Sequence, residues 1–208
     1  SGFLINSLIS KANKIKHNLN IYTGSKLDFS NDINEFDLDF NKYLKKELLK
    51  VKNSVIIING LYNNPGHDFN FIEQYQSFLD FFKLLQKNNN KIIFIQPVPL
   101  IKNPYQFSGQ NMKLINSIKK KKIFEYKIKK DEYYLTLADY FEFKKLILKN
   151  TTDVTFMKTE DIFCELNYCY SIRNGFFLLQ DREHQSGLSA NLISNLIIKE
   201  ILNFEKDK

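Results

Sequence analysis

Two short apolar runs constrain the fold of this chain more than any other feature of its sequence. Residues 54–59 (Ser-Val-Ile-Ile-Ile-Asn) and residues 91–96 (Lys-Ile-Ile-Phe-Ile-Gln) each contain an unbroken series of bulky apolar side chains. Such runs are typical of β-strands that are buried on both faces of a parallel sheet. Residues 69–86 between them are strongly apolar and long enough for a helix. The alternation predicts an α/β fold with a mostly parallel sheet.

The rest of the chain continues this alternation. Further helices are expected over residues 3–15, 38–49, 133–148 and from about 187 to 201, and further strands over residues 18–23, 154–157 and 176–179. Residues 101–130 show no clear pattern and are expected to form an insertion or a long connection. With no internal repeat and no linker, residues 1–208 are expected to form one domain. Parallel sheets place their sites outside the carboxyl ends of the strands, so the loops after residues 23, 59, 96 and 180 are the candidates.

The bulk composition narrows the class of protein. A chain of 208 residues with 43% hydrophobic residues can bury a real core, and no apolar run approaches the length of a membrane-spanning helix. No signal-peptide pattern occurs in residues 1–15, so any export signal is expected outside this sequence. The net charge of +7 is almost entirely lysine, as an AT-rich genome would produce. The run from Lys119 to Lys122 is therefore interpreted as a solvated face, and nucleic acid is not an expected partner.

The two cysteines indicate a local disulfide bond. Cys164 and Cys169 lie five positions apart, which is not the Cys-x-x-Cys spacing of a redox motif. None of the three histidines completes a recognisable zinc spacing with them, so no metal is expected. A disulfide would imply an oxidising compartment, and two buried free thiols are the alternative.

Residues 176–190 predict an acid–base pair. An apolar run ends at a polar loop that holds Asp181 and His184 three residues apart, and apolar residues at helical spacing follow from about Gly187. Ser186 is placed to cap the first turn of that helix. In such a pair the imidazole removes a proton from a nucleophile, and the carboxylate fixes its tautomer. Because Asp-x-x-His is a common sequence, an ordinary surface loop is the alternative.

The segment from Asp161 to Ala190 resembles the closing block of SGNH hydrolases. It is most similar to the SGNH domain fused behind the membrane part of acyltransferase-3 family O-acetyltransferases. In that group a pair of cysteines, a glycine, a short apolar strand and an Asp-x-x-His-Leu-Ser-like loop follow in this order. Here Gln185 replaces the usual Leu and Ser189 stands where a Gly is usual. The resemblance implies a three-layer α/β/α sandwich with a flavodoxin-like sheet.

The resemblance also assigns roles to individual residues. His184 would be the general base, Asp181 its orienting partner, and Gly24 a backbone donor to the oxyanion. The Gly-Asp-Ser block that carries the nucleophile in SGNH enzymes does not occur in this sequence. Ser1 is either that nucleophile, a residue shortly after it, or a tag remnant, and the natural protein is expected to extend upstream with a further strand.

The remaining oxyanion block is irregular in this sequence. SGNH enzymes usually supply an Asn from a Gly-x-Asn motif, which is not met in residues 60–63 (Gly-Leu-Tyr-Asn). Asn59, Gly60 and Asn63 are the candidates for oxyanion or substrate contacts. Such donors matter because the acyl-transfer intermediate carries a negative oxygen.

Together these features predict O-acetyl transfer to or from a bacterial cell-surface polysaccharide through an acyl-serine. By the resemblance, a membrane acyltransferase domain in the same polypeptide would deliver the acetyl group, with no metal or bound cofactor. The location would be periplasmic or otherwise extracytoplasmic. A periplasmic or secreted carbohydrate esterase of the same fold is one alternative, and a catalytically inactive glycan-binding module is the other.

Overall fold

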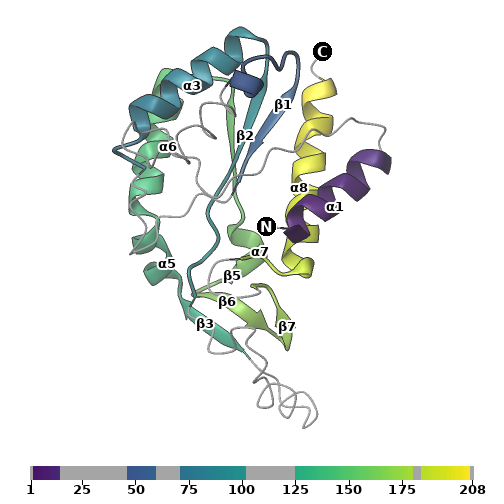
Figure 1. The fold of residues 1–208 in the computed structure, drawn as a ribbon. Coiled ribbons are helices and arrows are strands. Elements are labelled where there is room, and N and C mark those ends of the chain that lie inside the picture. The colour runs from purple at the N-terminus through teal and green to yellow at the C-terminus, as the bar shows by residue number, and fades with distance from the viewer. Residues whose placement is uncertain (1, 15–45, 60–70, 102–124, 180–183, 207–208) are drawn as a thin grey trace, which may run out of the picture. The chain divides into compact units, whose positions relative to one another are not determined.

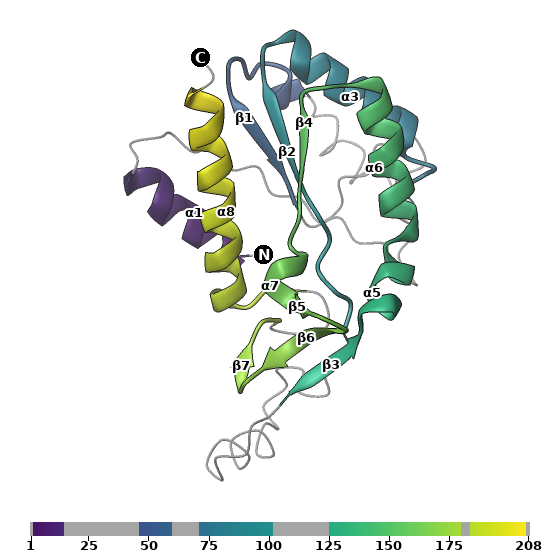
Figure 2. The same ribbon diagram turned by 180° about the vertical axis from the view of Figure 1, so that it is seen from behind.

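The computed structural model describes residues 2–14, 46–59, 71–101, 125–179 and 184–206 (Figure 1, Figure 2). The chain divides into two compact units. One comprises residues 20–97 and 137–157, and the other comprises residues 1–19, 98–136 and 158–208. Each unit is described separately, and the single domain expected over residues 1–208 stays a prediction.

The first unit is built on a parallel sheet. Strands β1 (Val55–Ile58), β2 (Lys91–Ile95) and β4 (Val154–Met157) pair in parallel with β2 in the centre. Residues 92–95 of the central strand are at most 2% exposed, so both faces of β2 are covered. This burial explains the uninterrupted apolar run and confirms the predicted α/β class with a parallel sheet.

Two helices pack on the sheet through an aromatic cluster. Phe78 of α3 (Tyr75–Lys87), Phe143 of α6 (Ala138–Asn150) and Phe94 of β2 are fully buried. Their ring centroids lie 5.3–6.0 Å apart in mutual tilted or edge-on contact. Aromatic pairs of this geometry add about 0.5–1.5 kcal/mol each beyond their burial. The cluster therefore fixes both helices on the same face of the sheet.

A buried amide joins the end of α3 to the start of β1. The Asn90 side chain is 2% exposed. It donates to the carbonyls of Val51 and Leu85 at 2.9 and 3.0 Å, and its oxygen accepts from the backbone N–H of Ser54 at 3.0 Å. The bonds to Val51 and Ser54 pair backbone groups of the segment before β1 with the segment that follows α3.

The second unit contains a pair of packed helices. Helix α1 (Gly2–Lys14) buries Leu4, Leu8 and Ala12, and helix α8 (Gly187–Lys206) packs against it. Ser7 of α1 donates to Asn191 of α8 at 3.4 Å. Both helices were predicted from their apolar spacing. No helix in the described ranges has the length and apolar content needed to cross a bilayer.

The second unit also contains an antiparallel sheet that was not predicted. Strand β6 (Tyr168–Arg173) pairs with β3 (Tyr126–Lys129), β5 (Cys164–Glu165) and β7 (Phe176–Phe177), and the short helices α5 (Lys130–Thr136) and α7 (Glu160–Phe163) adjoin it. The expected strand over residues 176–179 is therefore shorter and belongs to this sheet, not to the parallel one. Part of the region expected as a long connection, residues 101–130, is strand β3.

One predicted helix is interrupted. Residues 133–148 form parts of two helices, α5 and α6, because Leu137 leaves the helical conformation (φ −104°, ψ 7°). The hydroxyl of Thr136 donates to the carbonyl of Tyr133 at 2.7 Å and so competes with the helical ladder. Residues 18–24 lie outside the described residues, and so does most of the helix expected over residues 38–49. The structure describes that helix only from residue 46 onward, and residues 46–48 are helical.

Candidate active site

His184 lies at the end of a loop whose two sides are hydrogen-bonded to each other. Leu179 forms an isolated antiparallel bridge with Gln185, and the backbone N–H of Ser186 donates to the carbonyl of Leu178 at 3.0 Å. The His184 side chain itself is exposed, and it lies directly before the paired residue Gln185. The structure thus presents an imidazole to solvent from a fixed backbone position.

Two serines fasten this loop to the helix that follows it. The Ser186 hydroxyl accepts from the N–H of Ser189 at 3.3 Å, which confirms the predicted cap, and it donates to the carbonyl of Phe177 at 2.6 Å. The Ser189 hydroxyl is fully buried and donates to the carbonyl of Leu178. The serine that stands where a glycine was expected therefore has a structural role, because it ties the first turn of α8 to the strand side of the loop.

The same loop is tied to the antiparallel sheet. The carbonyl of Ser171 in β6 accepts from the N–H groups of Leu178 and Leu179 at 2.8 and 3.1 Å. Ser171 also donates through its hydroxyl to the carbonyl of Tyr126 in β3 at 3.4 Å. A displacement of β6 would therefore change the position of the backbone that leads to His184.

Gln185 differs from the serines of this loop, whose polar groups are hydrogen-bonded. Its side chain is fully buried, yet neither its amide oxygen nor its nitrogen has a hydrogen-bond partner in the described structure. An uncompensated buried amide is unfavourable by about 1–3 kcal/mol in mutational data. The residue next to His184 thus carries a free-energy cost that the leucine usual at this position would not have.

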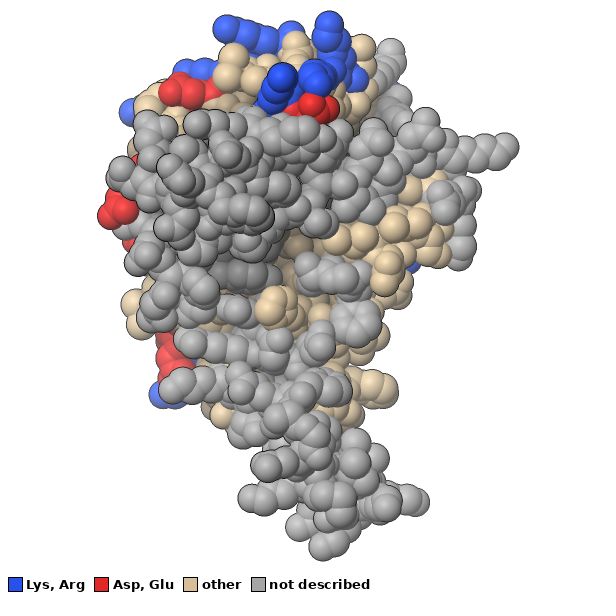
Figure 3. All heavy atoms as spheres, in the orientation of Figure 1, with Lys and Arg blue, Asp and Glu red and all other residues tan. Residues whose placement is uncertain are grey.

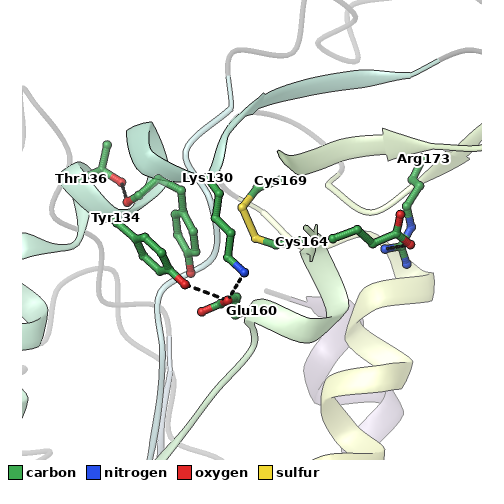
Figure 4. The surroundings of a disulfide bond; sticks show 9 residues. Lys130, Tyr134, Thr136, Glu160, Cys164, Cys169 and Arg173 are labelled. Carbon is green, nitrogen blue, oxygen red and sulfur yellow. Dashed lines mark hydrogen bonds and ion pairs between the residues drawn. A yellow bond between two sulfur atoms is a disulfide. The ribbon is translucent and has the colours of Figure 1, made fainter. Parts of the chain in front are cut away.

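The predicted disulfide is present. Cys164 and Cys169 are bonded with an S–S distance of 2.03 Å and are direct neighbours across β5 and β6 (Figure 4). Cys169 is fully buried. The bond closes the hairpin that leads into β6, and so it stabilises the strand to which the His184 loop is attached.

A charged cluster beside the disulfide was missed by sequence reasoning. The Lys130 Nζ lies 2.5 Å from Oε1 of Glu160, and the Tyr134 hydroxyl donates to the same oxygen at 2.8 Å (Figure 4). Burial alone would raise the pKa of Glu160, but these two hydrogen bonds outweigh it and lower that pKa. The hydrogen bond to Glu160 raises the pKa of Lys130. No motif marks these residues, because the lysine and the glutamate are 30 positions apart in the sequence.

One face of the antiparallel sheet carries tyrosines and basic side chains. The Nζ of Lys127 lies 4.5 Å from the ring centroid of Tyr168 and 5.5 Å from that of Tyr170. The guanidinium of Arg173 lies 5.9 Å from the Tyr170 ring and 2.9 Å from a carboxylate oxygen of Glu165. Tyr168 is exposed whereas Tyr170 is buried, so the contact with Lys127 holds the Tyr168 ring in place at the surface.

Lysines gather in a different place, in the parallel-sheet unit. They surround the C-terminal end of α3 and the amino ends of β1 and β2 (Figure 3). Lys50 and Lys91 of this group are paired with Glu47 and Asp153 at 2.5 and 2.8 Å. Because sites of parallel sheets form at the carboxyl ends of the strands, this basic patch is at the opposite edge of its sheet from the expected site.

The sequence from residue 8 to residue 199 matches the family described as "SGNH domain (fused to AT3 domains)". The chain belongs to this family. Among solved structures, the periplasmic domain of a lipopolysaccharide acetyltransferase from Salmonella ser. Paratyphi A is similar to this SGNH domain. The TM-score is 0.58 at 15% sequence identity, over 96% of this chain and 78% of that one. At this identity the likeness concerns the fold, and it confirms the predicted SGNH-like architecture. No curated protein matches the sequence.

Only some predicted site residues of the SGNH domain can be placed. His184 lies before α8 as expected, and Asn59 is partly buried directly after β1, at the carboxyl edge of the parallel sheet. The other five candidates lie outside the described residues, and their roles stay predictions: Ser1, Gly24, Gly60, Asn63 and Asp181. Within the described ranges, no three His, Cys, Asp or Glu side chains come close enough together to hold a metal ion.

Proposed function

We propose that this SGNH domain transfers O-acetyl groups to or from a bacterial cell-surface polysaccharide, with His184 as its general base. The observation that carries the proposal is the position of His184, which is exposed directly before the bridge residue Gln185 and the capped start of α8. Membership of a family fused to AT3 domains supports a membrane acyltransferase domain in the same polypeptide. The likeness to the periplasmic domain of a lipopolysaccharide acetyltransferase supports a glycan acceptor.

In the proposed mechanism, His184 removes the proton of a serine hydroxyl while the serine oxygen attacks the acyl carbonyl carbon of the donor. The serine is Ser1 or a residue shortly before it in the natural protein. Asp181 accepts a hydrogen bond from the other ring nitrogen of His184 and stabilises the imidazolium. When the tetrahedral intermediate collapses, the bond to the donor oxygen breaks and His184 returns the proton to that oxygen. A hydroxyl of the acceptor sugar then repeats these steps on the acyl-serine.

Donors to the negative oxygen of the intermediate are proposed at the carboxyl edge of the parallel sheet. Gly24 would contribute its backbone N–H, and Asn59, Gly60 and Asn63 are the further candidates. Removing one donor of an oxyanion hole typically costs about 100- to 1,000-fold in rate. The disulfide between Cys164 and Cys169 supports an extracytoplasmic location, because such bonds persist in oxidising compartments.

The proposal is tested by hydrolysis of p-nitrophenyl acetate by the full-length natural protein. His184→Ala should lose about 100- to 10,000-fold in kcat/KM, and Asp181→Asn should lose a large part of the activity. Lys199→Ala is the matched control, since Lys199 is an exposed residue of the same helix, α8. Equal rates in all four proteins would refute the catalytic role of His184. Acetate release without acetylation of added polysaccharide would instead assign an esterase.

A further inference from the structure

We propose that a shallow pocket at one end of the antiparallel sheet binds one neutral sugar unit of the polysaccharide. The inference rests on the proposed function, because it names a binding site for the same polymer. The pocket has a volume of about 270 Å³ and is lined by Lys129, Lys130, Asp131, Leu166, Asn167 and Tyr168. This is slightly below the roughly 300–1,000 Å³ of drug-sized ligand sites, which suits a ligand as small as one sugar ring.

The polar groups of the pocket suit hydroxyls that both donate and accept. Asp131 offers a carboxylate that accepts hydrogen bonds, whereas Lys129 and the Asn167 amide can donate. Neither Lys129 nor Asp131 forms an ion pair with any described residue, while the charge of Lys130 is matched by Glu160. One free positive and one free negative side chain leave the site without net charge. A neutral sugar fits this balance better than an acidic one.

The apolar groups of the pocket suit the C–H face of a sugar ring. Tyr168 is 38% exposed, and Lys127 holds its ring through the cation–π contact described above. Leu166 is 91% exposed at the tip of the hairpin and has a backbone φ of +38°, which is unusual for a bulky residue. The two-residue turn between Glu165 and Tyr168 requires such a φ and holds the exposed leucine in the lining of the pocket.

Bonds within the protein join the walls of the pocket to each other. The backbone N–H of Lys130 donates to the carbonyl of Asn167 at 2.8 Å, which joins the two walls. The disulfide between Cys164 and Cys169 closes the hairpin behind the pocket, and the Lys130–Glu160 pair fixes the start of α5 (Figure 4). A preformed site loses less side-chain entropy on binding, so even a few contacts can give measurable affinity.

The pocket and the His184 loop lie along the same strand. Tyr168 begins β6, and Ser171, which holds Leu178 and Leu179, follows about 10 Å further along it. The two places are thus connected within one unit but are separate sites. A polysaccharide would contact the pocket with one of its sugars and the His184 loop with another. The pocket should therefore affect the binding of the acceptor and not the acyl chemistry.

The first test is binding of methyl glycosides of glucose, galactose, mannose and rhamnose, with methyl glucuronide as the acidic probe. Backbone amide chemical shifts of Asn167 and Tyr168 in ¹⁵N-labelled protein are followed during titration. At least one neutral glycoside should shift them, and Tyr168→Ala and Asp131→Asn should weaken that binding about tenfold, equivalent to roughly 1.4 kcal/mol. Tyr168→Phe should keep most of the affinity, because it keeps the ring. Phe176→Ala is the matched control, an aromatic residue 65% exposed on β7 of the same sheet and outside the pocket lining.

Three results would overturn the proposal: no shift with any neutral glycoside, equal affinity in Tyr168→Ala and wild type, or binding of the glucuronide alone. In the enzyme assay, Tyr168→Ala should raise KM for polysaccharide about tenfold, whereas the control Phe176→Ala should leave that KM unchanged. A protein that binds the glycoside but hydrolyses no ester would keep the sugar site and refute the catalytic proposal. Should Tyr168→Ala fail to fold, the Asp131→Asn titration decides, since that substitution changes only an exposed side chain.

Discussion

Gln185 offers a direct test of how the loop before α8 is built, because its fully buried amide has no hydrogen-bond partner in the described structure. Replacing it with leucine removes the uncompensated amide, whose burial is unfavourable by about 1–3 kcal/mol. Leucine is similar in size, so the change in packing should cost less than about 1.5 kcal/mol. The expected net effect of Gln185→Leu is a rise of about 1–2 kcal/mol in the free energy of unfolding.

This rise is measurable by urea unfolding followed by circular dichroism. With an unchanged m-value, the midpoint should move to higher urea, and the melting temperature should rise by about 2–4 °C for each kcal/mol. Gln185→Ala is the control, since it also removes the amide but leaves a cavity, and it should not stabilise. If Gln185→Leu lowers the free energy of unfolding by more than about 1 kcal/mol, the amide must be satisfied, and the reasoning is refuted.

Three further predictions concern stability. Asn90→Leu should lower the free energy of unfolding by about 2–3 kcal/mol in the same urea assay, since the three hydrogen bonds of a buried side chain are lost; an unchanged midpoint would contradict this. Replacing both cysteines by alanine should cost about 2 kcal/mol, the chain-entropy value for a closed loop with a sequence separation of five; reducing agent should affect the wild type alone. Because the pKa of Glu160 lies below its ordinary value of 4.5, its contacts stabilise the fold above that pH and are lost as the pH falls through the folded-state pKa. The stability difference between wild type and Glu160→Gln should therefore shrink in acid, and a constant difference from pH 7 to acid would exclude this role.

The parallel sheet was predictable because its strands are visible in the sequence as apolar runs, over residues 55–58 and 92–95, although only the central strand is buried on both faces and Val55, Ile56 and Ile57 of β1 are half-buried. Helix α8 follows a regular apolar spacing with a capping serine before it. Each of these signals is local. The same is true of the disulfide, whose two cysteines are close in sequence.

The antiparallel sheet was not predictable because its signals are neither local nor apolar. Strand β3 alternates lysine with Tyr126 and Ile128 and pairs with β6, which lies about 40 residues later. Strands β5 and β7 have only two residues each. Such short strands depend on their pairing with β6: a strand was expected over residues 176–179, but nothing local in the sequence indicates that it pairs with β6.

The candidate site was predictable in part. His184 and Ser186 lie where the Asp-x-x-His pattern and the helix start placed them. The sequence did not show that Ser189 bonds to the carbonyl of Leu178 or that the amide of Gln185 has no partner in the described structure. Both facts depend on which backbone groups lie near these side chains in the folded protein. The cluster of Lys130 and Glu160 was missed for the same reason: it joins residues that only the folded sheet brings together.

The disulfide has a consequence for how this protein family can change. It links Cys164 to Cys169 directly across two strands, so β5 and β6 cannot slip by one residue. A slip would move every side chain of the strand to the opposite face, and with the register covalently fixed that move is prevented. Exposed positions such as Lys127, Lys129 and Tyr168 can therefore be substituted without a change of register. The hairpin therefore keeps its register whichever side chains its exposed positions carry.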